Sequence, residues 1–102
     1  MSSLVRICAQ SDVPTAGQVH EFTVGGQAFC VANVDGTVCV LDGICPHEGG
    51  PLGEGTIENG CVVCPWHTIA FDARTGATDE DPDMKARVFP AKIEGGALFA
   101  HV

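Results

Sequence analysis

The sequence predicts an all-β domain of short antiparallel strands. Thirteen Gly and six Pro divide the 102 residues, and the stretches between them are short and rich in Val, Ile, Phe and Thr. Such stretches, bounded by turn residues, are typical of strands. Gly25-Gly26 and Asp35-Gly36 each separate two of them by two residues, the spacing of tight hairpins. Because the chain shows no internal repeat, low-complexity segment or linker, we expect one domain over residues 1–102.

The individual strands follow from the same pattern. They are expected at 4–8, 18–24, 27–34, 37–42, 61–64, 69–72, 86–93 and 97–102. Besides the two hairpins, Glu94-Gly95-Gly96 predicts a further turn. No window predicts a helix, because Pro82 interrupts the one candidate at 79–87.

Residues 43–60 differ from the rest of the chain. They contain six of the thirteen Gly and two of the six Pro, which predicts a long loop in the middle of a compact β domain. Loops of that length without secondary structure are usually functional or disordered. We therefore expect the functional site at this loop.

Composition and charge exclude several classes of protein. A hydrophobic content of 45% is too high for a disordered tail, and no apolar run approaches the roughly 20 residues that cross a bilayer. The first residues do not resemble a secretory signal, so we expect a cytoplasmic location. A net charge of −8 makes nucleic acids and anionic membranes poor partners, and a basic protein a better one.

Two short segments combine metal-ligating side chains. Cys45-Pro46-His47 and Cys64-Pro65-Trp66-His67 each offer one thiolate and one imidazole, so together they can bring two sulfur and two nitrogen ligands to one place. The alternatives are core thiols with surface His, or one zinc ion. Structural zinc sites usually pair Cys with Cys and His with His at short spacing, whereas each segment here mixes the two.

The pattern CPHEGG–PLGEG–CPWH–F-D-TG resembles the Rieske [2Fe–2S] family over about residues 43–76, although Thr68 stands where many members have Gly. The resemblance implies a Rieske-type antiparallel β-sandwich with a small cluster-binding subdomain inserted at about 43–76. It also implies one [2Fe–2S] cluster per chain, with Cys45 and Cys64 on one iron and His47 and His67 on the other. The His edges are then the expected port for electrons.

The resemblance also bears on the reduction potential. High-potential members carry a disulfide at the positions of Gly50 and Trp66, and hydroxyl donors at those of Ile69 and Phe71. The chain has neither feature and no Tyr at all. Because hydrogen bonds to the sulfurs raise the potential, and negative charge lowers it, we expect a value below about 0 mV, in the lower part of the family range.

A chain of 102 residues has no room for a catalytic domain beside the cluster. We therefore expect a ferredoxin that is not an enzyme alone and carries electrons from a flavin-dependent reductase to a terminal oxygenase, such as a dioxygenase. The alternative is a small subunit of an assimilatory NAD(P)H nitrite reductase, to which the same motif is also similar.

The remaining chemistry-bearing residues have simpler interpretations. Cys8, Cys30, Cys39 and Cys61 are expected to be buried reduced thiols, with a role beside the ligands left open for Cys61. His20 and His101 are expected at the surface. Trp66 either shields the cluster or packs in the core, and the acidic run at 79–83 is either a solvated loop or a docking site for a basic partner.

Overall fold

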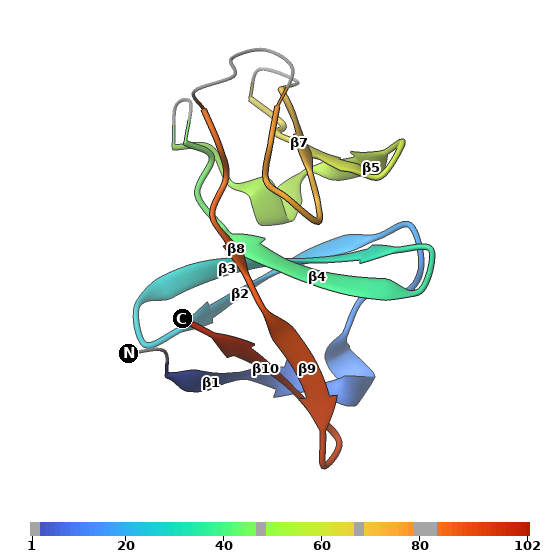
Figure 1. Ribbon diagram of the computed structural model, residues 1–102, viewed down its shortest axis with the longest axis vertical. Coiled ribbons are helices and arrows are strands. Elements are labelled where there is room, and N and C mark those ends of the chain that lie inside the picture. The colour runs from blue at the N-terminus through green and yellow to red at the C-terminus, as the bar shows by residue number, and fades with distance from the viewer. Residues whose placement is uncertain (1–2, 47–48, 67–68, 79–83) are drawn as a thin grey trace.

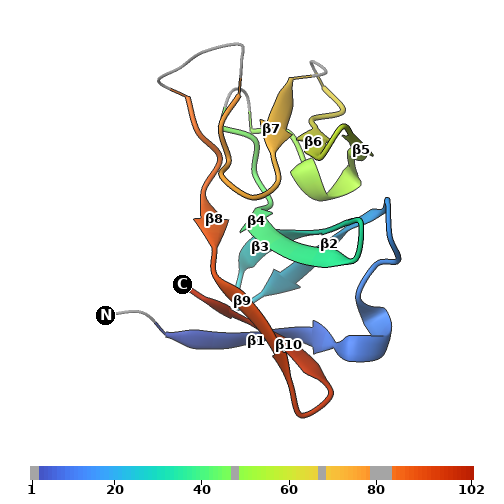
Figure 2. The same cartoon turned by 45° about the vertical axis from the view of Figure 1, so that its right-hand side comes forward.

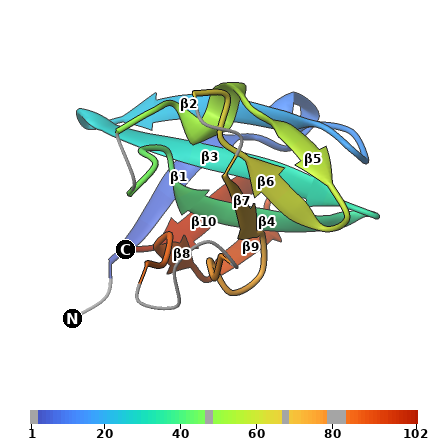
Figure 3. The same ribbon diagram turned by 90° about the horizontal axis from the view of Figure 1, so that it is seen from above.

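The structure, a computed structural model, describes residues 3–46, 49–66, 69–78 and 84–102. Its strands form three antiparallel sheets, stacked from top to bottom in Figure 1. The upper sheet has the order β5-β6-β7, the central sheet β2-β3-β4-β8 and the lower sheet β1-β10-β9. The view from above in Figure 3 shows the upper sheet lying over β3 and β4. The all-β antiparallel fold class is therefore confirmed.

The strand bounds are as follows: β1 Leu4–Ala9, β2 Val19–Val24, β3 Gln27–Val34, β4 Thr37–Asp42, β5 Thr56–Glu58, β6 Cys61–Val63, β7 Ala70–Asp72, β8 Val88–Phe89, β9 Ala91–Glu94 and β10 Ala97–His101. Two short 3₁₀ turns, η1 (Gln10–Asp12) and η2 (Leu52–Glu54), are the helical elements of the described part of the chain. None of the described residues belongs to a helix long and apolar enough to cross a membrane.

The predicted hairpins are confirmed, and their backbone explains the residues used. Gly25 and Gly26 connect β2 to β3 with φ of 59° and 84°, and Asp35 and Gly36 connect β3 to β4 with φ of 52° and 92°. Positive φ at both central residues gives a turn whose twist matches that of the flanking strands. Gly95-Gly96 connects β9 to β10 in the same way.

The prediction of a loop without secondary structure at 43–60 is wrong. The segment contains η2 and β5, and β5 pairs with β6 across Asn59-Gly60. Both turn residues have positive φ, 51° and 79°, so Asn59-Gly60 is a hairpin signal of the same kind as the other two. Because β5 is short and lies in a Gly-rich stretch, its strand pattern is weak in the sequence.

The prediction of a single strand at 86–93 is also wrong, and Pro90 provides the reason. Proline has no N–H to donate to a sheet ladder, and the chain leaves one sheet and enters another at this residue. β8 pairs with β4 in the central sheet, whereas β9 pairs with β10 in the lower sheet. The other expected strands begin or end within one residue of the observed ones.

The central sheet separates two hydrophobic cores. Phe29 and Val31 of β3 point toward the lower sheet and pack in a core with Leu98. Cys30 and Ala32, the alternate residues of the same strand, belong to the second core under the upper sheet. Since successive side chains of a strand point to opposite faces, β3 is buried on both, and the upper sheet rests on a rigid base.

The glycine at position 76 fixes how the chain leaves the upper sheet. A Cβ on Gly76 would lie 1.9 Å from the carbonyl oxygen of Ala86. Gly17 has a similar backbone conformation, with φ of +86° against +80° for Gly76, but a Cβ there would have no other atom within 4 Å. Gly17→Ala should therefore cost about 1–2 kcal/mol through its backbone conformation, and Gly76→Ala about 1–3 kcal/mol more through the clash.

Thermal unfolding followed by circular dichroism measures the difference. A lowering of Tm by about 4–8 °C per kcal/mol is expected for a domain of this size. Equal midpoints for the two variants would show that the approach of Gly76 to Ala86 is not a structural constraint.

Candidate functional site

Two similar loops at the upper end of the molecule begin with the predicted Cys ligands. Loop 45–50 is closed by a hydrogen bond of 2.7 Å, donated by the N–H of Cys45 to the carbonyl oxygen of Gly50. Loop 64–69 is closed in the same register by the N–H of Cys64, which donates to the carbonyl oxygen of Ile69 at 2.9 Å. Each loop thus has a Cys at its first position, and both thiols are buried, at 2% and 1% exposure.

The two loops meet at a glycine. A Cβ on Gly50 would lie 3.0 Å from the Sγ atom of Cys64 and 3.0 Å from the ring of Trp66. Gly50 thus lets the end of the first loop lie directly against the thiol of the second. The same contact places Gly50 beside the Trp66 ring.

Each loop rests on a β element. The first is anchored to β3, because the N–H of Gly43 donates to the carbonyl oxygen of Ala28 at 2.9 Å. The N–H of Leu52 donates to the carbonyl oxygen of Gly43 at 3.0 Å, which closes the base of that loop. The second loop connects β6 and β7, whose last pair is Val63 with Ala70. The positions of both Cys are therefore set by backbone hydrogen bonds.

Apolar side chains surround the two thiols. Cys45 and Cys64 belong to the same buried core as Leu52, Ile69 and Phe71. Ile69 and Phe71 are 8% and 0% exposed and offer no hydroxyl. Two buried thiols in an apolar surrounding, each at the start of a tight loop, fit the thiolate half of an iron–sulfur site, because Cys thiolates are the ligands such clusters use.

Two of the predicted ligands, His47 and His67, lie outside the described residues, as does the acidic run at 79–83. The structure therefore brings the two Cys segments together and describes nothing of the imidazoles. Trp66 has an exposure of 58%, so the interpretation of this residue as core packing is wrong.

The other cysteines behave as predicted in all but one case. Cys8, Cys30 and Cys39 are buried in strands and outside any disulfide. Burial raises the pKa of Cys30 to about 12, with the Glu21 carboxylate as a second cause. Burial also raises the pKa of Cys8 and Cys39, so these groups remain thiols at neutral pH. Cys61, at the start of β6, is half-buried instead.

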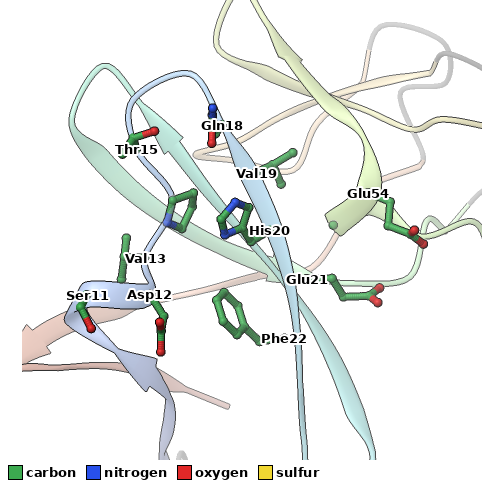
Figure 4. A pocket seen from close by; sticks show the side chains of 12 residues that line it. Ser11, Asp12, Val13, Thr15, Gln18, Val19, His20, Glu21, Phe22 and Glu54 are labelled. Atoms are coloured by element: carbon green, nitrogen blue, oxygen red, sulfur yellow. The ribbon is translucent and has the colours of Figure 1, made fainter.

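The remaining His residues lie away from the two loops. His20 on β2 is exposed, as predicted, whereas His101 is half-buried. His20 contacts Phe22, with 6.3 Å between ring centroids. His20 and Phe22 line a hollow of about 630 Å³ beside η1, shown in Figure 4. Of the predicted ligands, the two that the structure describes, Cys45 and Cys64, do not line this hollow.

Comparisons with known proteins agree with this site. The model of the Rieske [2Fe-2S] domain family matches residues 3–93. The ferredoxin component of the p-cumate 2,3-dioxygenase system of Pseudomonas putida is 33% identical over 104 aligned residues, which cover 100% of this chain and 88% of the relative. The structure of the Sphingomonas yanoikuyae B1 ferredoxin is 29% identical, with a TM-score of 0.85 over 98% of this chain and 99% of its own.

A second solved structure shares the fold at lower identity. It is described as an NADH-dependent nitrite reductase small subunit from Mycobacterium tuberculosis, and it is 19% identical with a TM-score of 0.86. The alignment covers 100% of this chain and 96% of the other.

The fold and the paired loops therefore define an iron–sulfur protein. The chain belongs to the Rieske [2Fe-2S] domain family, and its cofactor is one [2Fe–2S] cluster. The resemblance stated from the motifs is confirmed, and the interpretations as a zinc site or as structural thiols are wrong.

Sequence patterns did not reveal the backbone closure of the two loops or the role of Gly50. The Gly-Gly pair at 49–50 was visible in the sequence, but the reason for Gly50 is a contact with residues of the other loop. Such a contact between distant segments leaves no periodic signal.

Alkylation can test the protection of Cys30. With a pKa of about 12, only ~0.1% of this thiol is thiolate at pH 9. Raising the pH from 7 to 9 should therefore leave Cys30 unlabelled by iodoacetamide in the folded, cluster-loaded protein, as measured by peptide mass spectrometry. Labelling in urea is the positive control. Labelling of folded Cys30 as fast as that of half-buried Cys61 would contradict the assignment.

Proposed function

We propose that this chain is a one-electron carrier whose cluster is held by Cys45 and Cys64 on one iron and His47 and His67 on the other. The observation that carries the proposal is the pair of loops closed by Cys N–H groups and meeting at Gly50. In each segment the His follows its Cys within three residues. The domain proposal is a single domain over 1–102 with its cluster-binding subdomain at about 43–76.

The chain's own residues prepare the site for this role. The apolar side chains of Leu52, Ile69 and Phe71 keep water from the thiolate side. Gly50 leaves space for the second loop against the first. When bound, the cluster supplies reversible one-electron chemistry between two ferric irons and a ferric–ferrous pair. No part of this assignment provides a site for a substrate, so the proposed role is not catalytic.

Exposed apolar side chains mark the proposed contact surface for redox partners. Ile44 and Trp66 are 54% and 58% exposed, and they lie next to Cys45 and Pro65 in the two loops. Large apolar side chains of this kind are enriched in protein interfaces. A partner bound there would lie over the ligand loops, which keeps the path for electrons short.

The proposed partners are a flavin-dependent reductase as donor and a terminal oxygenase as acceptor. The ferredoxin component of a dioxygenase system is 33% identical over an alignment that covers 100% of this chain, which supports this assignment. The net charge of −8 supports partners other than nucleic acids and anionic membranes. The proposed location is the cytoplasm.

The alternative is a small subunit of an assimilatory nitrite reductase. The likeness to the Mycobacterium tuberculosis structure fits this alternative, but at that identity it concerns the fold alone. Reduced protein offered separately to a terminal oxygenase and to a sirohaem nitrite reductase subunit would discriminate the two. Reoxidation by the oxygenase is the expected result, and reoxidation by the sirohaem subunit alone would favour the alternative.

Substitution of the proposed ligands tests the site. Cys45→Ser and His67→Ala should each abolish the rhombic electron paramagnetic resonance signal of the reduced protein, because each removes one ligand of a different iron. Cys61→Ser and His20→Ala are matched controls outside the ligand set and should retain it. Iron and sulfide analysis shows whether the cluster is lost or altered. An unchanged signal in either ligand variant would reject the assignment.

The reduction potential is a second test. Protein-film voltammetry should give a value below about 0 mV, because buried Ile69 and Phe71 donate no hydrogen bonds from their side chains. Phe71→Tyr supplies a hydroxyl at the position that carries one in high-potential members. A hydrogen bond worth about 1 kcal/mol more in the reduced state would raise the potential by ~40 mV.

Phe22→Tyr is the control for this test, since Phe22 packs against the other core and should leave the potential unchanged. A wild-type potential near the upper end of the family range, about +300 mV, would contradict the argument. Equal shifts in both Tyr variants would show that the hydroxyl does not act at the site.

A further inference from the structure

A groove of about 670 Å³ lies between the turn that follows β7 and the segment that leads into β8. This segment descends from the upper part of the molecule to the central sheet in Figures 1 and 2. Arg74, Lys85 and Arg87 line the groove, with Val88 and Pro90 beside them. We call this surface the basic groove.

The charge of the basic groove is opposite to that of the rest of the chain. Its cations are three of the five Lys and Arg. With these three set aside, two Lys and Arg remain against 13 Asp and Glu, a balance of −11. The groove is therefore a local positive site on a strongly acidic protein.

Backbone hydrogen bonds hold the two sides of the groove together. The N–H of Ala86 donates to the carbonyl oxygen of Gly76 at 2.8 Å, and Ala77 pairs with Lys85. On one side, the Asp72 carboxylate accepts the N–H of Arg74 at 2.8 Å. On the other, the guanidinium of Arg87 lies 4.8 Å from the centre of the Phe89 ring. The backbone positions that carry the cations are thus held by the fold.

The three cations are available to a partner. All three are exposed, and none has a carboxylate of the described residues within ion-pair distance. In contrast, Lys92 on β9 forms an ion pair with Glu94, with 2.8 Å between Nζ and Oε2. Among the described residues, the groove cations are therefore exposed and form no such ion pair.

We propose that the basic groove docks a protein partner through a surface segment rich in Asp and Glu. The cations are spread along an exposed groove and none is buried, which suits an extended row of carboxylates better than one compact anion. The rest of the chain would repel such a segment, so the partner would meet this face in one orientation. Complementary charges of this kind raise association rates and fix the docking register.

This inference goes beyond the proposed electron transfer, because no proposed ligand stands among the described residues that line the groove. It concerns a surface on the side of the molecule, and its test measures binding alone. Failure of either proposal therefore leaves the other standing.

The test uses a fluorescein-labelled peptide of eight Glu and the cluster-loaded protein, with binding measured by fluorescence anisotropy. The groove variant combines Arg74→Gln with Lys85→Gln. The matched control combines Arg6→Gln with Lys92→Gln. Each lowers the formal net charge from −8 to −10, so their comparison separates location from total charge. Circular dichroism shows that both variants are folded.

At an ionic strength near 0.01 M, the groove variant should bind the peptide ~2- to 30-fold more weakly than wild type, as expected for loss of two exposed ion pairs. The control should lose much less affinity than the groove variant, and binding should weaken at 0.15 M, where the Debye length falls from about 30 to 8 Å. Equal losses in both variants, or no binding by wild type, would overturn the proposal.

Two further arms identify the occupant. In the sequence, the groove residues are close to four acidic residues, Asp79, Glu80, Asp81 and Asp83. The comparison of peptide binding with and without the groove substitutions is therefore repeated with these four replaced by Asn or Gln. The loss in the groove variant should persist, and its disappearance would overturn the proposal. Inorganic tripolyphosphate is the second probe. Tighter binding of tripolyphosphate than of the peptide would overturn the proposal in favour of a compact-anion site.

Discussion

The burial of β3 and β4 on both faces is the constraint on which the rest of the structure depends. Phe29 and Val31 pack toward the lower sheet, while Cys30, Ala32 and Leu41 support the upper one. A sheet covered on both sides cannot shift its register without placing one core's residues in the other. The first ligand loop leaves this sheet directly after β4 and is tied back to it through Gly43 and Ala28.

The two ligand loops are closed by the same kind of backbone hydrogen bond. In both loops the N–H of a buried Cys closes the turn, so the residue that offers the thiol also fixes its own backbone. Where the loops touch, Gly50 lies against the Cys64 thiol and the Trp66 ring. A contact between two loops thus stands at positions where a disulfide occurs in high-potential members of the family, and the apolar Ile69 and Phe71 lie where hydroxyl donors occur. The absence of both features is the basis for the low potential that we propose.

The distribution of charge complements this arrangement. The exposed apolar residue Trp66 lies in the second ligand loop and Ile44 directly precedes the first, whereas three of the five basic residues gather at the groove between β7 and β8. Apolar contact near the loops and ionic contact at the groove use different physical forces, and salt weakens the second much more than the first. A partner that used both surfaces would be selected by shape near the ligand loops and by charge at the basic groove.

The sequence by itself determined the strands, the hairpins and the pair of Cys segments, because period-two patterns, Gly-Gly or Asp-Gly turns and short ligand spacings are local. It also identified the family, and the assignment of His47 and His67 remains a prediction from its motif. It missed β5 and the break at Pro90, where pairing with β6 and with two different sheets overrode a weak or continuous local pattern. Tertiary structure alone decided the contact of Gly50 with Cys64 and the gathering of Arg74, Lys85 and Arg87. Both join segments far apart in the chain, and their geometry depends on how the sheets pack.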